Sequence, residues 1–129
     1  MRAVQRAMAT FAARSVIAPW LGRMLPEPLV SRVAATSATA ALEAWGCADG
    51  GRGLVYVLQD LNRTQGAVGD AQLRVSGLPA DTAMRVEVWS TSGASESPLA
   101  AVSTATVGDV LVLPLPAFEE DVVVAFVAG

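Results

Sequence analysis

Residues 84–127 read MRVEVWSTSGASESPLAAVSTATVGDVLVLPLPAFEEDVVVAFV, and this stretch decides the fold. It begins with an alternating apolar strand that ends at Trp89 and continues through a turn rich in Ser and Gly into a second extended stretch. The short strand LVLPLP follows, and acidic residues then precede an apolar run at residues 121–127. Short strands separated by turn residues are typical of an antiparallel β-sandwich.

The sequence before this stretch shows the same pattern of short strands from about residue 31 onward, with turn residues at intervals of about ten. The clearest tight turn is ADGGRG at 48–53, where Asp and Gly suit a hairpin. The runs at 54–58 and 122–127 are apolar on both faces and should be the central strands. We therefore predict a mainly β domain of about seven strands. The predicted strands are 39–46, 53–60, 71–76, 84–91, 99–106, 110–113 and 121–127.

The first thirty residues differ from the rest, because they carry four Arg and no acidic residue before Glu27. Val4, Met8 and Phe11 recur at helical spacing, and Pro19 lies where such a helix should end. We expect one amphipathic α-helix over residues 2–17 that packs through these three side chains. Residues 1–30 then form a helix and linker, and residues 31–129 form the β-sandwich domain. An organelle transit peptide has a similar Arg-rich, acid-free composition and is the alternative.

Composition excludes two classes of partner for this chain of 129 residues, a length that suits one domain. The formal net charge is −3 and every cationic side chain is Arg, so the basic surface that nucleic-acid binding requires is missing. Mean hydropathy is +0.46, yet no apolar run approaches the roughly 20 residues of a membrane span. The apolar run between Arg6 and Arg14 is too short for a secretory signal, so we expect a cytoplasmic protein as encoded.

The residues that usually carry catalysis are scarce. His is absent and Cys47 is the only cysteine, which excludes Ser-His and Cys-His pairs, imidazole metal sites and an intrachain disulfide. Glu119, Glu120 and Asp121 form the densest acidic cluster, but adjacent residues of an extended segment point to opposite faces. We interpret the cluster as a solvated turn. The sequence thus predicts no catalytic residue, no metal site and no cofactor.

Three segments in order carry a resemblance to a known family: AWGCADGGRGLVYVLQD at 44–60, LRVSGLPADTAMRVEVWSTSGASESP at 73–98 and VGDVLVLPLPAFEEDVVVAFV at 107–127. Together they resemble the C-terminal β-sandwich that follows the catalytic (β/α)8 barrel in bacterial glycoside hydrolases. The segment MRAVQRAMATFAARSV at 1–16 is similar to the last helix of such a barrel. Two departures stand out, since Asp81 and Thr82 replace a frequent Gly, and no Asp follows Trp89.

The resemblance implies a non-catalytic accessory domain that packs on a catalytic barrel or stabilises it. In the resembling family the catalytic carboxylates lie on the barrel, so this chain is not expected to be an enzyme by itself. A self-associating structural protein, with the helix over 2–17 as its contact, is an alternative in which the partner is another copy of the chain.

A carbohydrate-binding module is the other alternative. The alternation in residues 84–89 places Arg85, Glu87 and Trp89 on the face opposite the apolar side chains. An exposed indole can stack on a pyranose ring of a polysaccharide, with Arg85 and Glu87 as polar partners. The competing interpretation is that Trp89 covers the sheet or packs on the N-terminal helix. Trp45, next to a glycine, is expected to seal the sandwich.

Overall fold

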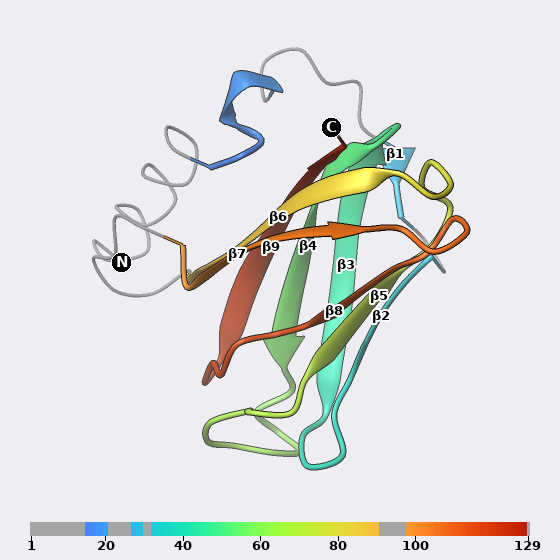
Figure 1. Cartoon of the computed structure of the whole chain (residues 1–129). Coiled ribbons are helices and arrows are strands. Elements are labelled where there is room, and N and C mark those ends of the chain that lie inside the picture. Colours follow the sequence, from blue (N-terminus) through green and yellow to red (C-terminus); the bar gives the residue numbers. More distant parts are fainter. Residues whose placement is uncertain (1–14, 21–26, 30–31, 91–97, 129) are drawn as a thin grey trace.

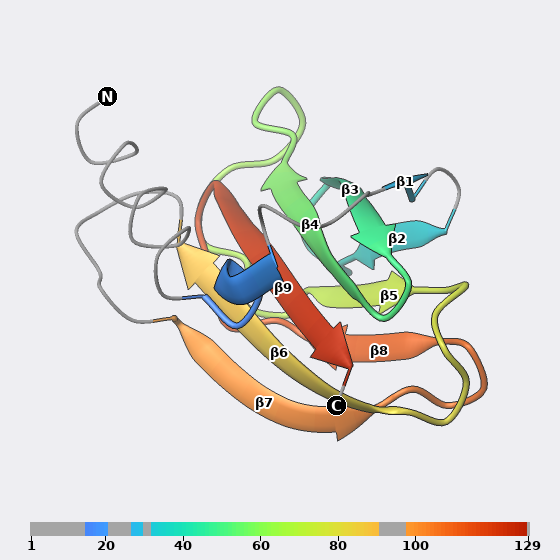
Figure 2. The same cartoon turned by 90° about the horizontal axis from the view of Figure 1, so that it is seen from above.

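Two antiparallel β-sheets packed face to face make up the computed structural model, which describes residues 15–20, 27–29, 32–90 and 98–128 (Figure 1; Figure 2). A short 3-10 helix precedes the strands of the described residues. The elements are η1 (Ala18–Trp20), β1 (Glu27–Pro28), β2 (Val33–Thr36), β3 (Leu42–Asp49), β4 (Arg52–Gln59), β5 (Gln72–Val75), β6 (Ala83–Ser90), β7 (Ala100–Ala105), β8 (Leu111–Pro114) and β9 (Asp121–Ala128).

The larger sheet has the strand order β1-β3-β4-β9-β6-β7, and the smaller sheet has the order β2-β5-β8. All neighbouring strands run antiparallel. The prediction of a mainly β, sandwich-like architecture is confirmed. The strands β4 and β9 lie side by side at the centre of the larger sheet, as their apolar sequences predicted.

The seven predicted strands correspond to β3 through β9, and two strands were missed. The strand β3 begins and ends three residues later than predicted, because its register is fixed by a turn at Gly50 and Gly51 that sets Asp49 opposite Arg52. Gly50 has a φ of 61°, a conformation that favours glycine. The tight turn predicted at 48–53 is therefore confirmed.

The N-terminal helix predicted over residues 2–17, including Val4, Met8 and Phe11, lies outside the described residues except at its end. There, residues 15–17 form a turn that leads into η1. Among the described residues, no helix has both the length and the apolar character needed to cross a membrane.

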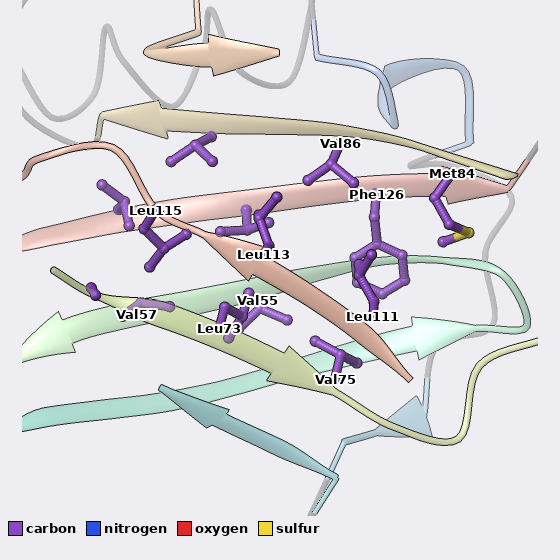
Figure 3. Packing of buried hydrophobic residues seen from close by; sticks show 14 of the residues in the cluster. Val55, Val57, Leu73, Val75, Met84, Val86, Leu111, Leu113, Leu115 and Phe126 are labelled. Atoms are coloured by element: carbon purple, nitrogen blue, oxygen red, sulfur yellow. The ribbon is translucent and has the colours of Figure 1, made fainter. Parts of the chain in front are cut away.

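The hydrophobic core lies between the two sheets, and three strands contribute to it by strict alternation. Alternate residues of β4, β5 and β8 are buried, while the residues between them are exposed or half-buried. Figure 3 shows side chains from both sheets meeting in this layer. Core residues labelled there are Val55, Val57, Leu73, Val75, Met84, Val86, Leu111, Leu113, Leu115 and Phe126.

An exposed aspartate ties the loop after β2 to the loop before β5. The Asp70 carboxylate accepts hydrogen bonds from the Ser37 hydroxyl at 2.5 Å, the Thr39 hydroxyl at 3.0 Å and the Ala38 amide at 2.9 Å. The hydrogen bond from Ser37 lowers the pKa of Asp70 most, and those from Thr39 and Ala38 lower it further. Because the pKa is lowered, these hydrogen bonds stabilise the folded state while Asp70 is ionised, and they weaken as acid protonates Asp70.

Close packing at the centre of the larger sheet requires a glycine on β4. Gly53 lies opposite Phe126 of β9, and the Phe126 ring covers it. A Cβ atom added at Gly53 would lie 2.4 Å from the Cys47 carbonyl oxygen and 2.8 Å from the Phe126 Cζ. Both distances are shorter than a van der Waals contact, so this position has no room for a side chain.

We predict that Gly53→Ala lowers the free energy of unfolding by about 1–3 kcal/mol, because the added methyl group overpacks the contact with Phe126. Gly69→Ala is the matched control, since a Cβ there meets no atom within 4 Å. Urea unfolding followed by circular dichroism measures both variants. Equal stability of the two variants would contradict the tight contact.

Candidate functional site

The outer face of the larger sheet carries an apolar row where a solvated face would be polar. Side chains that alternate with the core residues point to this face. The strand register places Trp45 of β3, Tyr56 of β4, Val123 of β9 and Trp89 of β6 side by side across four strands. We call these four residues the aromatic row. Its two ends have different surroundings.

The Trp89 end of the aromatic row is covered by the chain itself. Trp89 is only 2% exposed, and it packs with Ile17, Val123, Ala125 and Val127 in a cluster separate from the main core. Ile17 is fully buried in this cluster. Residues 15–20 therefore act as a lid over β6 and β9.

Glu87 fastens this lid through hydrogen bonds. Its Oε1 accepts one from the Trp89 Nε1 at 3.0 Å and one from the Val16 amide at 2.5 Å. One carboxylate thus satisfies a buried indole N–H and a backbone N–H of the lid. Without Glu87, the Trp89 and Val16 N–H groups would lose this acceptor, which costs free energy when a donor is buried.

The sequence predicted a sugar-binding site from Arg85, Glu87 and Trp89. Trp89 lies on the face opposite the main core, as predicted, but its ring offers no free surface for stacking on a sugar because residues 15–20 cover it. Glu87 is engaged with Trp89 and Val16. Arg85 is exposed on the same strand face. The described structure therefore brings the three residues onto one face without forming a sugar platform from them.

The Trp45 end of the aromatic row is open to solvent. Trp45 is 54% exposed, so the expectation that it seals the sandwich is wrong. The reason lies in β3, whose core side is occupied by Leu42, Ala44 and Ala48, leaving Trp45 on the outer side. The Trp45 and Tyr56 rings lie 5.7 Å apart, centroid to centroid, with their planes at 51°.

A shallow hollow of about 400 Å³ adjoins this aromatic pair, and most of its lining is apolar. It lies on the outer face of β3, β4 and β9, beside the region that the lid covers. We call it the Trp45 hollow. It is lined by Trp45, Gly46, Cys47, Leu54, Val55, Tyr56 and Val123.

Two carboxylates lie in the row next to the aromatic row, on the same face of the sheet. The Tyr56 hydroxyl donates a hydrogen bond to Asp121, the first residue of β9. Burial, this hydrogen bond, and the negative charges of Asp121 and Glu120 raise the pKa of Tyr56 to about 12. The register puts Glu43 in the same row as Asp121. Glu120 and its neighbour Glu119 are exposed in the turn before β9, where the sequence placed them.

No group of three His, Cys, Asp or Glu side chains suited to hold a metal ion occurs in the part of the chain that the structure describes. Asp70, Glu87 and Asp121 instead accept hydrogen bonds from other parts of the protein. The chemistry available around the Trp45 hollow is therefore apolar contact, aromatic stacking and hydrogen-bond acceptance by nearby carboxylates.

No family model matches this chain, and no curated protein matches its sequence.

We predict that Tyr56, the single tyrosine of the chain, titrates near pH 12 in the folded protein and near pH 10 in urea. Because folding raises this pKa, the stability that Tyr56 contributes is present below about pH 10 and is lost as the pH rises toward 12. Absorbance at about 295 nm, where phenolate absorbs, follows the titration directly. Asp121→Asn should move the midpoint back toward pH 10, and an ordinary midpoint in the unaltered protein would refute the contact.

We also predict that Glu87→Ala lowers the free energy of unfolding by about 1–3 kcal/mol, because it leaves the Trp89 and Val16 N–H groups without their acceptor. Hydrogen exchange at the Val16 amide should accelerate in this variant. The control is Glu43→Ala, which removes an exposed glutamate from the same sheet face and should change stability by less than about 0.5 kcal/mol. Unchanged exchange at Val16 would contradict the fastening role of Glu87.

Proposed function

We propose that this chain is a non-catalytic β-sandwich accessory domain that docks on a neighbouring folded domain through the Trp45 hollow. The exposure of Trp45 is the observation that carries the proposal. Large exposed aromatic side chains within an apolar patch are typical of interaction surfaces, and buried Trp residues often dominate the binding energy there. Burying the exposed part of the Trp45 indole would contribute roughly 2–3 kcal/mol.

The position of the lid supports a partner attached on the N-terminal side. Val16 and Ile17 belong to the same apolar cluster as Leu54 and Tyr56, which also line the hollow, so the N-terminal segment reaches the larger sheet on this face. The sequence resemblance suggests what this partner is. We infer that the partner is the catalytic (β/α)8 barrel of a glycoside hydrolase, and that this chain stabilises it.

A carbohydrate-binding module is the second candidate, with Trp45 as the stacking residue instead of Trp89. Its support is the exposed Trp45 ring and the carboxylates of Glu43 and Asp121 in the next row of the same face, which can accept hydrogen bonds from sugar hydroxyls. The tilt of 51° between the rings of Trp45 and Tyr56 suits a single sugar ring better than an extended flat platform. The mainly apolar lining of the hollow favours docking over this candidate.

The deciding experiment begins by sequencing the DNA upstream of the Met1 codon, to ask whether the open reading frame continues and encodes a barrel. In the longer chain, Trp45→Lys should lower the melting temperature of the barrel by several degrees, because a charge would be buried at the contact. Leu61→Lys, at an exposed apolar residue in a loop away from the hollow, should leave it unchanged. An unchanged melting temperature of the barrel in the Trp45→Lys variant would overturn the docking proposal.

The second candidate predicts a different result for the chain of residues 1–129 alone. Titration with soluble xylan, cellulose, starch and chitin oligosaccharides should then change Trp fluorescence in a saturable way, and Trp45→Ala should abolish the change. The docking proposal expects no saturable change with any of the four.

A further inference from the structure

The edges of the two sheets are not protected equally. An edge strand presents unpaired N–H and C=O groups, which another strand can extend unless charges, proline or brevity prevent it. Among the described strands, β1 is two residues long and contains Pro28, and β8 is four residues long and ends at Pro114. The four-residue β2 lies against β3 of the other sheet. These three edge strands are therefore poorly suited to pair with an added strand.

The strand β7 has none of these protections. Its six residues, AAVSTA at Ala100–Ala105, include no charge, no proline and no glycine. It pairs with β6 along one side only, and no described strand pairs with its other side. Figure 2 shows β7 along the outer border of the larger sheet.

The core side of β7 is also uncovered at Val102. Val86 of β6 and Val102 of β7 are directly paired and point to the same side of the sheet. Val86 is 1% exposed, whereas Val102 is 41% exposed. The smaller sheet therefore covers β6 but stops short of β7. An apolar side chain on the core side of an edge strand is left facing solvent.

We propose that a second copy of this chain adds its own β7 to this edge, antiparallel, so that the larger sheets of two copies form one continuous sheet. A two-fold axis perpendicular to the sheet keeps the core sides of both copies on one side. Residues that pair directly must then share a side, which several registers allow. Of these, the register with Val102 opposite Val102 of the partner subunit buries the two exposed valines against each other. Ala101 lies opposite Ser103 of the partner subunit by the same register.

The chemistry of this arrangement fits an identical strand. The two uncovered valines bury each other at the axis, the remaining pairs are small, and no like charges face one another. On the outer face, the row of Glu87 and Ala101 continues to Ser103 and Arg85 of the partner subunit, so the nearest charges across the contact have opposite sign. Each β7 is already extended and held by β6, which lowers the entropy cost of pairing. The proposal does not depend on the proposed function.

A six-residue ladder buries less surface than the roughly 1,200 Å² of a stable interface, so a dissociation constant of about 10 to 500 µM is expected. Sedimentation equilibrium of the whole chain, from about 5 to about 500 µM, spans this range. We expect a reversible monomer to dimer transition. A monomer at every concentration would overturn the proposal.

Two variants locate the contact. Val102→Lys places like charges at the axis and should weaken the dimer at least tenfold, about 1.4 kcal/mol. Val112→Lys is the matched control, because Val112 is 43% exposed on β8 of the smaller sheet and should leave the dimer intact. Circular dichroism confirms that each variant is folded. A dimer that both lysines leave intact, or that both weaken equally, would place the contact elsewhere and overturn the proposal.

A crosslink gives an independent test should the lysine variant fail to fold. In a Cys47→Ser background, Val102→Cys should form a disulfide-linked dimer on mild oxidation, because the two Cβ atoms across the axis are about 5 Å apart in a directly paired position. Val112→Cys should remain monomeric under the same conditions. Equal crosslinking of the two variants would contradict pairing through β7.

Discussion

The strand β9 is apolar on both of its faces, and covering both faces is the constraint on which the rest of the structure depends. On one side, Val122, Val124 and Phe126 enter the core between the sheets. On the other side, Val123, Ala125 and Val127 need a second cover, which Ile17 and Trp89 provide. A sandwich of two sheets alone would leave that second side in water, at a cost of roughly 25 cal/mol for each Å² of apolar surface.

The functional face follows from how far this second cover extends. Residues 15–20 cover β6 and β9, while the aromatic row continues past them onto β4 and β3. Trp45 and Tyr56 therefore lie at the end of the row that the lid does not cover, with Trp45 exposed and Tyr56 half-buried. The proposed docking partner would complete the cover that the lid begins. The proposed pairing through β7 concerns the opposite border of the same sheet.

The sequence predicted the strands that alternate clearly or are apolar throughout, together with the turn at Gly50. It missed β1 and β2, because a two-residue strand containing Pro28 and the short segment VAAT carry no periodic signal. It placed Trp89 on the correct face and offered its burial against the sheet or the N-terminal segment as one interpretation. It could not decide between burial and exposure, because the burial depends on Ile17 from a distant part of the chain. Trp45 was misjudged because the sequence placed it at a strand end, whereas β3 continues to Asp49 and carries Trp45 on its outer side. Alternation predicts the face of a residue, whereas exposure depends on what packs there.

The division of the aromatic row into a covered and an open end is the central claim, and acrylamide quenching of single-tryptophan variants tests it most directly. In one variant Trp20 and Trp45 are changed to Phe, which leaves Trp89, and in the other Trp20 and Trp89 are changed, which leaves Trp45. Trp45 should be quenched several times more strongly than Trp89, since 54% of its surface is exposed and only 2% of that of Trp89 is. Equal quenching, or stronger quenching of Trp89, would contradict the account.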